Sequence, residues 1–275
     1  MNGAAKSFIG AGLIACALIL SPSAFAHQHG GGDAAKDKKP WSQADAYYDP
    51  QEMAKTRVAG QKAMGGGTNW FAMADRLEAR IGEGEDGMLW DGQGWYGGDI
   101  NKLWIKSEGE YSFDSGEFDE AEAQALWSRA ITRYFDLQTG VRHDFKPAGK
   151  TYGVIGVQGL APYWFEIDAA AFISGDGELT ARIESEYDLL LTQRLILQPR
   201  AEIELSAQDV PELEIGAGVT KLDAGLRLRY EIVREFAPYI GVEWQGSFGD
   251  TADYVRAAGG DPKRVLFLAG LRVWF

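Results

Sequence analysis

The sequence predicts an all-β protein: a transmembrane, antiparallel up-and-down β-barrel of about twelve strands, preceded by a short N-terminal tail with a helix. Three observations predict this fold. Residues 1–26 have the features of a secretory signal. From residue 68 onward, apolar and polar residues alternate with period two in segments of about ten residues. The links between these segments are short at every second connection and often longer in between, which is typical of bacterial outer-membrane barrels.

The predicted signal begins with Lys6 and continues as an apolar run over residues 8–20, followed by a small-residue cleavage site at Ala24-Phe25-Ala26. Pro22 ends the apolar run before it is long enough to span a membrane. The stretch before Cys16 resembles a lipobox, so lipidation of Cys16 is an alternative to cleavage after Ala26. Cleavage after Ala26 is favoured because Cys16 lies inside the apolar run.

Cleavage after Ala26 would remove the only cysteine, so no disulfide or thiolate metal site is predicted in the mature chain. It would also remove Lys6 but no acidic residue, so the formal net charge of −13 becomes more negative by one unit. A chain this acidic is not expected to bind nucleic acid.

Residues 27–67 form the predicted periplasmic tail. Its first part, "HQHGGGDAAKDKKP", is polar and rich in glycine, so we expect it to be disordered. Further on, Asp49 is a candidate N-cap and Pro50 suits the first position of a helix. The sequence therefore predicts a short helix that ends near Met64, before the glycines at 65–67.

Residues 68–275 form the predicted barrel. In "LTARIESEYDL", Leu179, Ala181 and Ile183 share one face while Arg182 and Glu184 lie on the other. We expect strands to begin near Phe71, Met88, Lys102, Ala121, Phe135, Tyr152, Phe165, Leu179, Leu195, Leu222, Ala237 and Val265. The chain ends on the aromatic Phe275 at a strand terminus. A soluble barrel or sandwich, with the charged faces in solvent and the apolar faces packed together, is the alternative.

Aromatic residues cluster near the short links, as in the interfacial girdle of membrane barrels. The predicted girdle comprises Trp95 and Tyr96, Tyr134 and Phe135, Tyr163 to Phe165, and Phe236 and Tyr239.

Charged residues of both signs share the polar face of the predicted strands. The basic ones are Arg182, Arg200, Arg227, Arg229 and Arg272, and the acidic ones are Glu166, Asp168, Glu184, Glu186, Glu202, Glu204 and Glu243. A barrel of this size holds water or a plug rather than a wide solute channel. The sequence predicts ion-pair networks that line and fill the lumen, with a cation path along the carboxylates as the alternative.

Two of the three histidines follow the predicted cleavage site. Cleavage after Ala26 would start the mature chain at His27-Gln28-His29. A free amine, two backbone amides and the imidazole of His29 supply four nitrogens in the square plane that Cu(II) favours, and His27 could add a further imidazole. The alternative is a chance pair of histidines in a solvated tail.

Methionine thioethers favour Cu(I) and are the second candidate ligands. Met53 and Met64 lie eleven residues apart, close to three helical turns, so both would project from one side of the predicted helix. Met73 and Met88 would lie close together if "GEGED" closes a hairpin. Each methionine alone is also explained by packing.

His143 has the parity of Leu137 and Val141, so it is expected on the apolar, outward side, while Asp144 faces inward. We include it as a candidate metal ligand, with an interfacial histidine as the alternative. No serine neighbours it in sequence, and the chain has neither a nucleophile elbow nor a phosphate-binding loop in a strand-to-helix context. The sequence therefore predicts a protein that is not an enzyme.

Several long segments resemble the copper-resistance protein B family over about residues 41–275. They are "YYDPQEMAKTR", "WDGQGWYGGDINKLWIKSEGE", "ALWSRAITRYFDLQTGVRHDF" and the stretch from "GLAPYWFEIDAAAFISGDG" to "LQPRAEIEL". The resemblance implies an outer-membrane barrel that acts in copper resistance, usually beside a periplasmic multicopper oxidase. Family members often carry an N-terminal extension rich in Met and His, which in this sequence is short.

The predicted function is therefore that of a monomeric barrel in the outer membrane that binds copper ions and exports or sequesters periplasmic copper. Its expected partners are outer-membrane lipid, copper ions and a periplasmic multicopper oxidase. A general small-solute porin and a structural docking barrel for that oxidase are the alternatives.

Overall fold

The computed structural model describes residues 40–64, 67–82 and 86–275. The N-terminal part contains a 3-10 helix, η1 (Pro40–Ala46), and an α-helix, α1 (Pro50–Met64). The backbone N–H groups of Gln51 and Glu52 donate to Oδ1 of Asp49 at 2.7 and 3.2 Å, which satisfies donors that a helix start otherwise leaves free. The predicted helix is confirmed at both ends, whereas η1 was not predicted.

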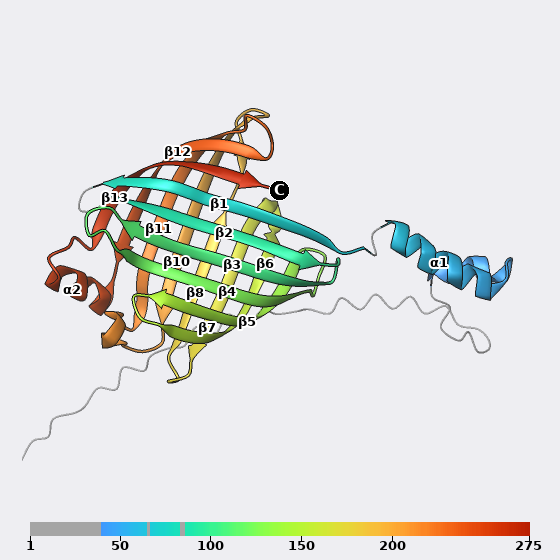
Figure 1. The fold of residues 1–275 in the computed structure, drawn as a ribbon, viewed down its shortest axis with the longest axis horizontal. Coiled ribbons are helices and arrows are strands. Elements are labelled where there is room, and N and C mark those ends of the chain that lie inside the picture. The colour runs from blue at the N-terminus through green and yellow to red at the C-terminus, as the bar shows by residue number, and fades with distance from the viewer. Residues whose placement is uncertain (1–39, 65–66, 83–85) are drawn as a thin grey trace, which may run out of the picture. The chain divides into compact units, whose positions relative to one another are not determined.

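The larger unit is a closed, antiparallel β-barrel (Figure 1). Its strands are β1 (Asn69–Gly82), β2 (Gly87–Gly97), β3 (Asn101–Ser112), β4 (Phe118–Ala130), β5 (Phe135–Lys146), β6 (Lys150–Ala161), β7 (Phe165–Ser174), β8 (Leu179–Glu186), β9 (Leu189–Leu190), β10 (Leu195–Ser206), β11 (Gly218–Tyr230), β12 (Phe236–Ser247) and β13 (Lys263–Trp274). Apart from β8 and β9, each strand pairs with the next along the chain, and β13 pairs with β1 to close the wall. β8 and the two-residue β9 both pair with β10 and act as one interrupted strand. The described residues thus build the predicted twelve-stranded barrel.

The two ends of the barrel differ. One end, the turn end, holds the links 98–100, 131–134, 162–164, 191–194 and 231–235, together with the start of β1 and the end of β13. The link at 162–164 is a 3-10 turn, η2 (Pro162–Trp164). The other end, the loop end, holds two long connections that contain η3 (Pro211–Leu213) and α2 (Gly249–Ala257). No helix in the described part of the chain has the length and hydropathy that crossing a membrane requires.

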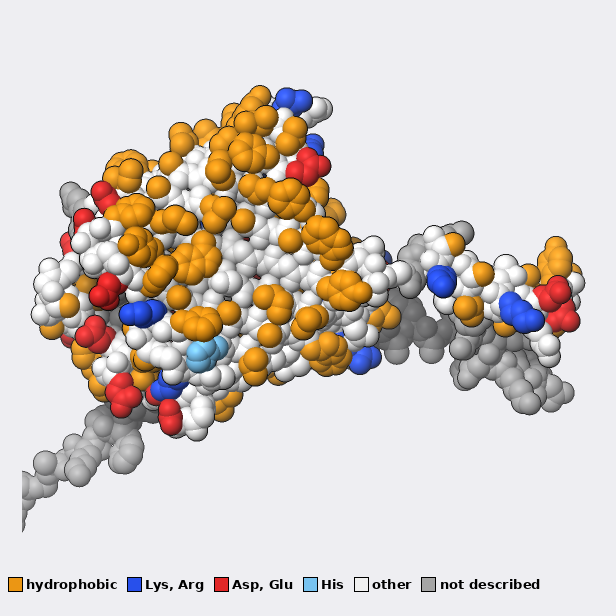
Figure 2. All heavy atoms as spheres, in the orientation of Figure 1, with side chains coloured by type: hydrophobic (Ala, Val, Ile, Leu, Met, Phe, Trp, Pro, Cys, Tyr) orange, Lys and Arg blue, Asp and Glu red, His pale blue; other side chains and the backbone are white. Residues whose placement is uncertain are grey.

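The wall has an apolar outside and a charged inside. On β3, Leu103 and Ile105 are exposed outward, while Trp104 between them lines the lumen. Figure 2 shows hydrophobic side chains over the barrel wall and charged ones mainly toward its ends. Inside, Arg227 and Glu78 are only 2% and 1% exposed. This arrangement is the reverse of the soluble barrel considered above, whose interior would be apolar.

One part of the lumen is apolar. Leu126, Tyr152, Val154 and Phe172, from β4, β6 and β7, form a buried cluster there, with Trp104 and Ala170 packed against it. The guanidinium of Arg142 on β5 lies over the rings of Phe172 and Tyr152, with its carbon 4.6 and 5.5 Å from the ring centres. The charged groups of the lumen are therefore bounded on one side by this cluster.

The predicted aromatic girdle is correct in part. Tyr96, Tyr134, Phe165 and Phe236 are exposed at the turn end. Trp95 and Tyr239 are not part of the girdle: Trp95 packs on Trp104 in the lumen, and Tyr239 is buried with its hydroxyl 3.0 Å from Glu78. The prediction failed for these two because residues near a turn still alternate between the two faces of the strand, and Trp95 and Tyr239 are on the inward face.

Candidate functional site

The lumen contains a buried ion-pair cluster near the β1 wall. Arg227 on β11 binds both carboxylate oxygens of Glu78 on β1 and also Glu243 on β12, at 2.8 Å. Arg80 contacts Glu78 and Glu243 from the same side, both at 3.1 Å. The hydroxyl of Tyr239 donates to Glu78. Each buried charge in this cluster has a partner of opposite sign, as burial in a low-dielectric interior requires.

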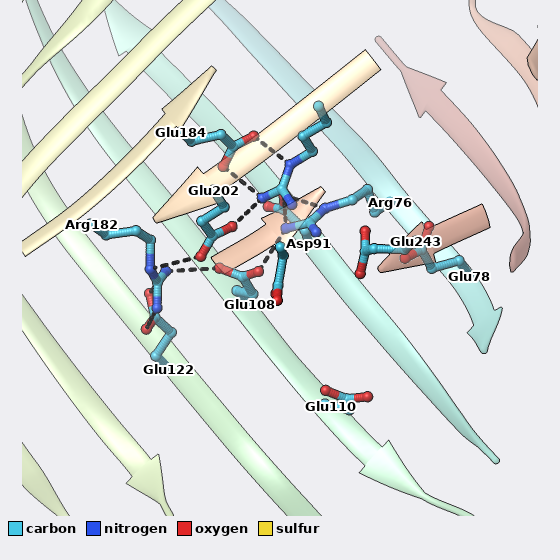
Figure 3. Close-up of polar contacts among 12 residues, drawn as sticks. Arg76, Glu78, Asp91, Glu108, Glu110, Glu122, Arg182, Glu184, Glu202 and Glu243 are labelled. Carbon is cyan, nitrogen blue, oxygen red and sulfur yellow. Dashed lines mark hydrogen bonds and ion pairs between the residues drawn. The ribbon is translucent and has the colours of Figure 1, made fainter. Parts of the chain in front are cut away.

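A second ion-pair cluster crosses the lumen beside the first (Figure 3). Arg76 on β1 contacts Asp91 on β2 at 3.0 Å and Glu108 on β3 at 2.6 Å. Arg200 on β10 holds Glu184 with two hydrogen bonds of 2.7 Å and also binds Glu202. The contacts of Arg76 join β1 to β2 and β3, and those of Arg200 join β10 to its neighbour β8.

Arg182 on β8 connects the second cluster to the facing wall. Its Nη1 lies 2.9 Å from Glu108 on β3, and its Nη2 lies 3.2 Å from Glu122 on β4. Its Nε lies 3.3 Å from Glu202 and 3.5 Å from Glu204 on β10. Figure 3 shows Glu122 and Glu108 approaching Arg182 from the green strands of that wall.

The prediction that the lumen is lined by ion pairs is confirmed for all five arginines named from the sequence. Arg182, Arg200 and Arg227 pair as described above, Arg229 contacts Asp188 at 2.5 Å, and Arg272 contacts Asp75 at 2.8 Å. The sequence reasoning missed Arg76, Glu78, Arg80, Glu108 and Glu122. Alternation in "RLEAR" and "WIKSEGE" was the signal for the first four of these residues, and alternation in "DEAEAQ" was the signal for Glu122.

Two facing carboxylates in the described part of the lumen form no salt bridge, although Arg272 lies near enough to interact with both electrostatically. Glu166 on β7 and Glu186 on β8 lie directly opposite each other in the sheet. Within the described residues, no Lys or Arg is in salt-bridge distance of either, and Glu186 only accepts a hydrogen bond from Gln198 at 2.9 Å. Like charges at facing positions repel, so this pair favours a nearby cation.

Two larger cavities lie between the ion pairs of the described lumen. The turn-end cavity, of about 360 Å³, is lined by nine acidic and four basic side chains, among them Glu166, Glu186, Asp168 and Lys106. The loop-end cavity, of about 340 Å³, is lined by seven acidic and four basic side chains. Residues of η3 and α2 also line the loop-end cavity. Both cavities therefore have an excess of negative charge.

The structure separates the two barrel methionines that the sequence placed together. The strand register pairs Met73 with Gln93 and Met88 with Ala79, so they lie near opposite ends of the β1–β2 hairpin. Met73 lies in the lumen with its sulfur 3.5 Å from Nη2 of Arg272, whereas Met88 is 41% exposed. The expectation was wrong because a hairpin pairs residues at equal distances from its turn.

The remaining candidate ligands lie on different parts of the chain. His143 is on the outward side as its parity indicated, with Nδ1 2.8 Å from Oγ1 of Thr151 and its ring edge-on to Phe145. Met53 lies on α1, which ends at Met64. His27 and His29 lie outside the described residues. In the part of the chain that is described, no group of three or more His, Cys, Asp or Glu has the geometry to hold a metal ion.

A closed barrel with an apolar outside and a charged lumen defines an outer-membrane β-barrel protein whose wall contacts lipid. The same fold occurs in the solved NanC porin, which is 9% identical, matches with a TM-score of 0.50, and covers 72% of this chain and 98% of the porin. The family model for "Copper resistance protein B precursor (CopB)" matches residues 68–275. This chain belongs to the CopB family.

Two relatives carry the family description. Copper resistance protein B from Escherichia coli is 46% identical over 208 residues, which is 75% of this chain and 70% of the relative. The Copper resistance protein B homolog from Pseudomonas syringae pv. tomato is 42% identical over 221 residues, which is 80% of this chain and 74% of the relative. Family and fold together assign this protein to the outer membrane and to copper resistance.

Proposed function

We propose that this protein binds copper ions in the turn-end cavity and passes them across the outer membrane, as its part in copper resistance. The observation that carries the proposal is the charge of that cavity, where nine acidic side chains face four basic ones. An excess of carboxylates inside a narrow, low-dielectric wall raises the local concentration of cations. Membership in the CopB family supports copper as the relevant cation.

The orientation supports copper entry from the periplasm. Outer-membrane barrels place their short turns in the periplasm and their longer loops outside. The turn end, with its acidic cavity, would then face the periplasm. In the proposed sequence of events, the amine of His27 and the imidazole of His29 first capture Cu(II) in the periplasm.

The tail and the lumen offer different types of copper ligand. Nitrogen ligands hold copper firmly, whereas carboxylates are weaker ligands for it. Glu166 and Glu186, which face each other and form no salt bridge in the described lumen, suit brief binding of copper during passage. Met73 adds one thioether inside the lumen, but the neighbouring guanidinium of Arg272 opposes a cation there. Passage through the lumen is therefore better supported than storage in it.

The general porin is less well supported as an alternative. The two cavities meet where Arg182 pairs across the lumen with Glu108 and Glu122, so ion pairs narrow the bore there. No contact within the described residues specifically favours the alternative of a docking barrel for a multicopper oxidase.

The test uses two double variants with equal changes in charge. Glu166→Gln with Glu186→Gln neutralises the facing pair in the turn-end cavity. Glu212→Gln with Asp253→Asn neutralises two exposed acids of the loop-end connections that line neither cavity. Binding of Cu(II) to the purified full chain in detergent is measured by equilibrium dialysis, and copper content is measured in cells that carry each version in place of the wild type.

The proposal predicts that the cavity variant loses bound copper and alters cellular copper content, while the control matches the wild type. The change in cellular content gives the direction of passage. Equal binding and equal cellular content in all three proteins would contradict the proposal. Copper-independent conductance would instead support the porin, and co-purification of an oxidase with unchanged copper binding would support the docking barrel.

A further inference from the structure

The turn-end and loop-end cavities meet at one place. Four residues line both of them: Glu108 on β3, Glu122 on β4, Phe172 on β7 and Arg182 on β8. One cavity extends from these residues to Tyr134 and Leu160 at the turn end. The other extends to Pro147 and Val255 at the loop end. A path for ions along the lumen would therefore pass through this set of four residues, which we call the septum.

Arg182 is the septum residue that spans the lumen. In the order of strands around the wall, β4 is four strands from β8, and β3 is five strands from it. Its contacts with Glu108 and Glu122 therefore cross the interior rather than run along the sheet. Each of these carboxylates also has a second basic partner: Arg76 contacts Glu108 at 2.6 Å, and Arg142 contacts Glu122 at 2.7 Å. We therefore expect both carboxylates to stay in place when Arg182 is replaced.

We infer that Arg182 closes the lumen between two acidic cavities, with its guanidinium held at the position that a passing cation would occupy. The guanidinium has carboxylates from β3, β4 and β10 around it. Without it, the septum keeps the same carboxylates with one positive charge fewer. The opened path would then favour cations over anions.

Arg182 would block small cations in general, whether or not copper is the ion that passes. The proposed function thereby gains a residue that decides whether the lumen conducts and for which sign of charge. A cation that enters either cavity must displace Arg182 from Glu108 and Glu122 before it can proceed.

The experiment measures conductance of the full-length protein in planar lipid bilayers with KCl, for the wild type, Arg182→Ala and Arg200→Ala. Arg200 is a matched control because it also pairs with lumen carboxylates, at 2.7 Å to Glu184, yet lines none of the described cavities. We expect the wild type and Arg200→Ala to be silent. Arg182→Ala should show discrete conductance steps, with a reversal potential shifted toward cation selectivity in a KCl gradient.

Neutralising the septum carboxylates tests the sign of charge. Adding Glu108→Gln and Glu122→Gln to Arg182→Ala should leave the steps but remove most of the shift in reversal potential. Correct folding of every variant is checked by the heat-dependent gel mobility of folded barrels. If Arg182→Ala does not fold, Arg182→Lys replaces it. Its single amine cannot bind both carboxylates as the guanidinium does, so brief openings are expected.

Three results would overturn the inference. They are a wild type that conducts freely, an Arg182 variant that folds and stays silent, and equal conductance in the Arg182 and Arg200 variants. None of these results would alter the copper test on Glu166 and Glu186, which measures binding and cellular content. The two proposals can therefore fail separately.

Discussion

Arg227 on β11 donates hydrogen bonds to both carboxylate oxygens of Glu78 on β1, at 3.1 Å from Nε and 2.9 Å from Nη2. β12 and β13 separate these two strands in the wall, so the ion pair extends through the lumen from one strand to the other. Both side chains are almost fully buried. This contact ties strands together that share no backbone hydrogen bonds.

Replacing Arg227 by Ala is expected to destabilise the barrel strongly. The change leaves Glu78 buried with only part of its compensating charge, and breaking a buried pair in this way costs about 3–5 kcal/mol. Unfolding by urea in lipid vesicles, followed by tryptophan fluorescence, measures the loss. Arg256→Ala is the control, since its pair with Asp253 is exposed on α2 and exposed pairs contribute about 1 kcal/mol or less. Equal losses for the two variants would show that the buried pair has no special role.

A charge on the outward face is expected to test the lipid contact of the wall. Ile155 is 60% exposed near the middle of β6, and Leu179 is exposed at the loop-end start of β8. Arginine at the bilayer midplane costs about 2–4 kcal/mol, and near the interface about 0–1 kcal/mol. Ile155→Arg should therefore lower the free energy of unfolding in vesicles far more than Leu179→Arg. A soluble exterior would make both substitutions nearly neutral.

Gly216 is expected to set the approach of the β10–β11 connection to α2. Its N–H donates to Oγ1 of Thr251 at 2.9 Å, and a Cβ there would lie 2.8 Å from Cβ of Asp250. Gly216→Ala forces the two segments apart, at the cost of about 1–3 kcal/mol that overpacking brings. Limited proteolysis of vesicle-embedded protein should cut the connection faster than in the wild type. Gly175→Ala, where a Cβ would meet nothing within 4 Å, should leave the rate unchanged.

The copper site predicted at the N-terminus depends on His29 being third in the mature chain. His29→Ala should remove the visible absorption band of square-planar Cu(II) and weaken binding in calorimetric titration. An alanine inserted before His27 keeps both histidines but moves His29 to the fourth position, so it should have a similar effect. A wild-type band in both variants would exclude the tail from copper capture.

Much of the fold followed from local patterns. Period-two alternation located all twelve wall strands and the inward face that holds Arg182 and Glu184. It also assigned His143 to the outside. The cap at Asp49 and the position of Pro50 gave the start of α1, and the glycines at 65–67 gave its end. These features were predictable because a strand face or a helix cap depends on residues a few positions apart in the chain.

The candidate site was less predictable. β1 has a β-bulge between Ala74 and Arg76. It places Asp75 beside Arg272 and Arg76 beside Glu108, so two consecutive residues both face the lumen. Strict alternation would have assigned them to opposite faces. Met73 and Met88 were separated by the register of the hairpin, which their spacing in sequence does not reveal.

The sequence by itself determined, for most residues of the wall, which face lipid and which face the lumen, and that the lumen carries charges of both signs. Only the tertiary structure decided that Arg227 meets Glu78, that Arg182 reaches Glu108 and Glu122, and that two cavities remain on either side of the septum. The physical reason is that a strand face is set by alternation along one segment. A contact across the lumen depends on the closure, tilt and register of all the strands together.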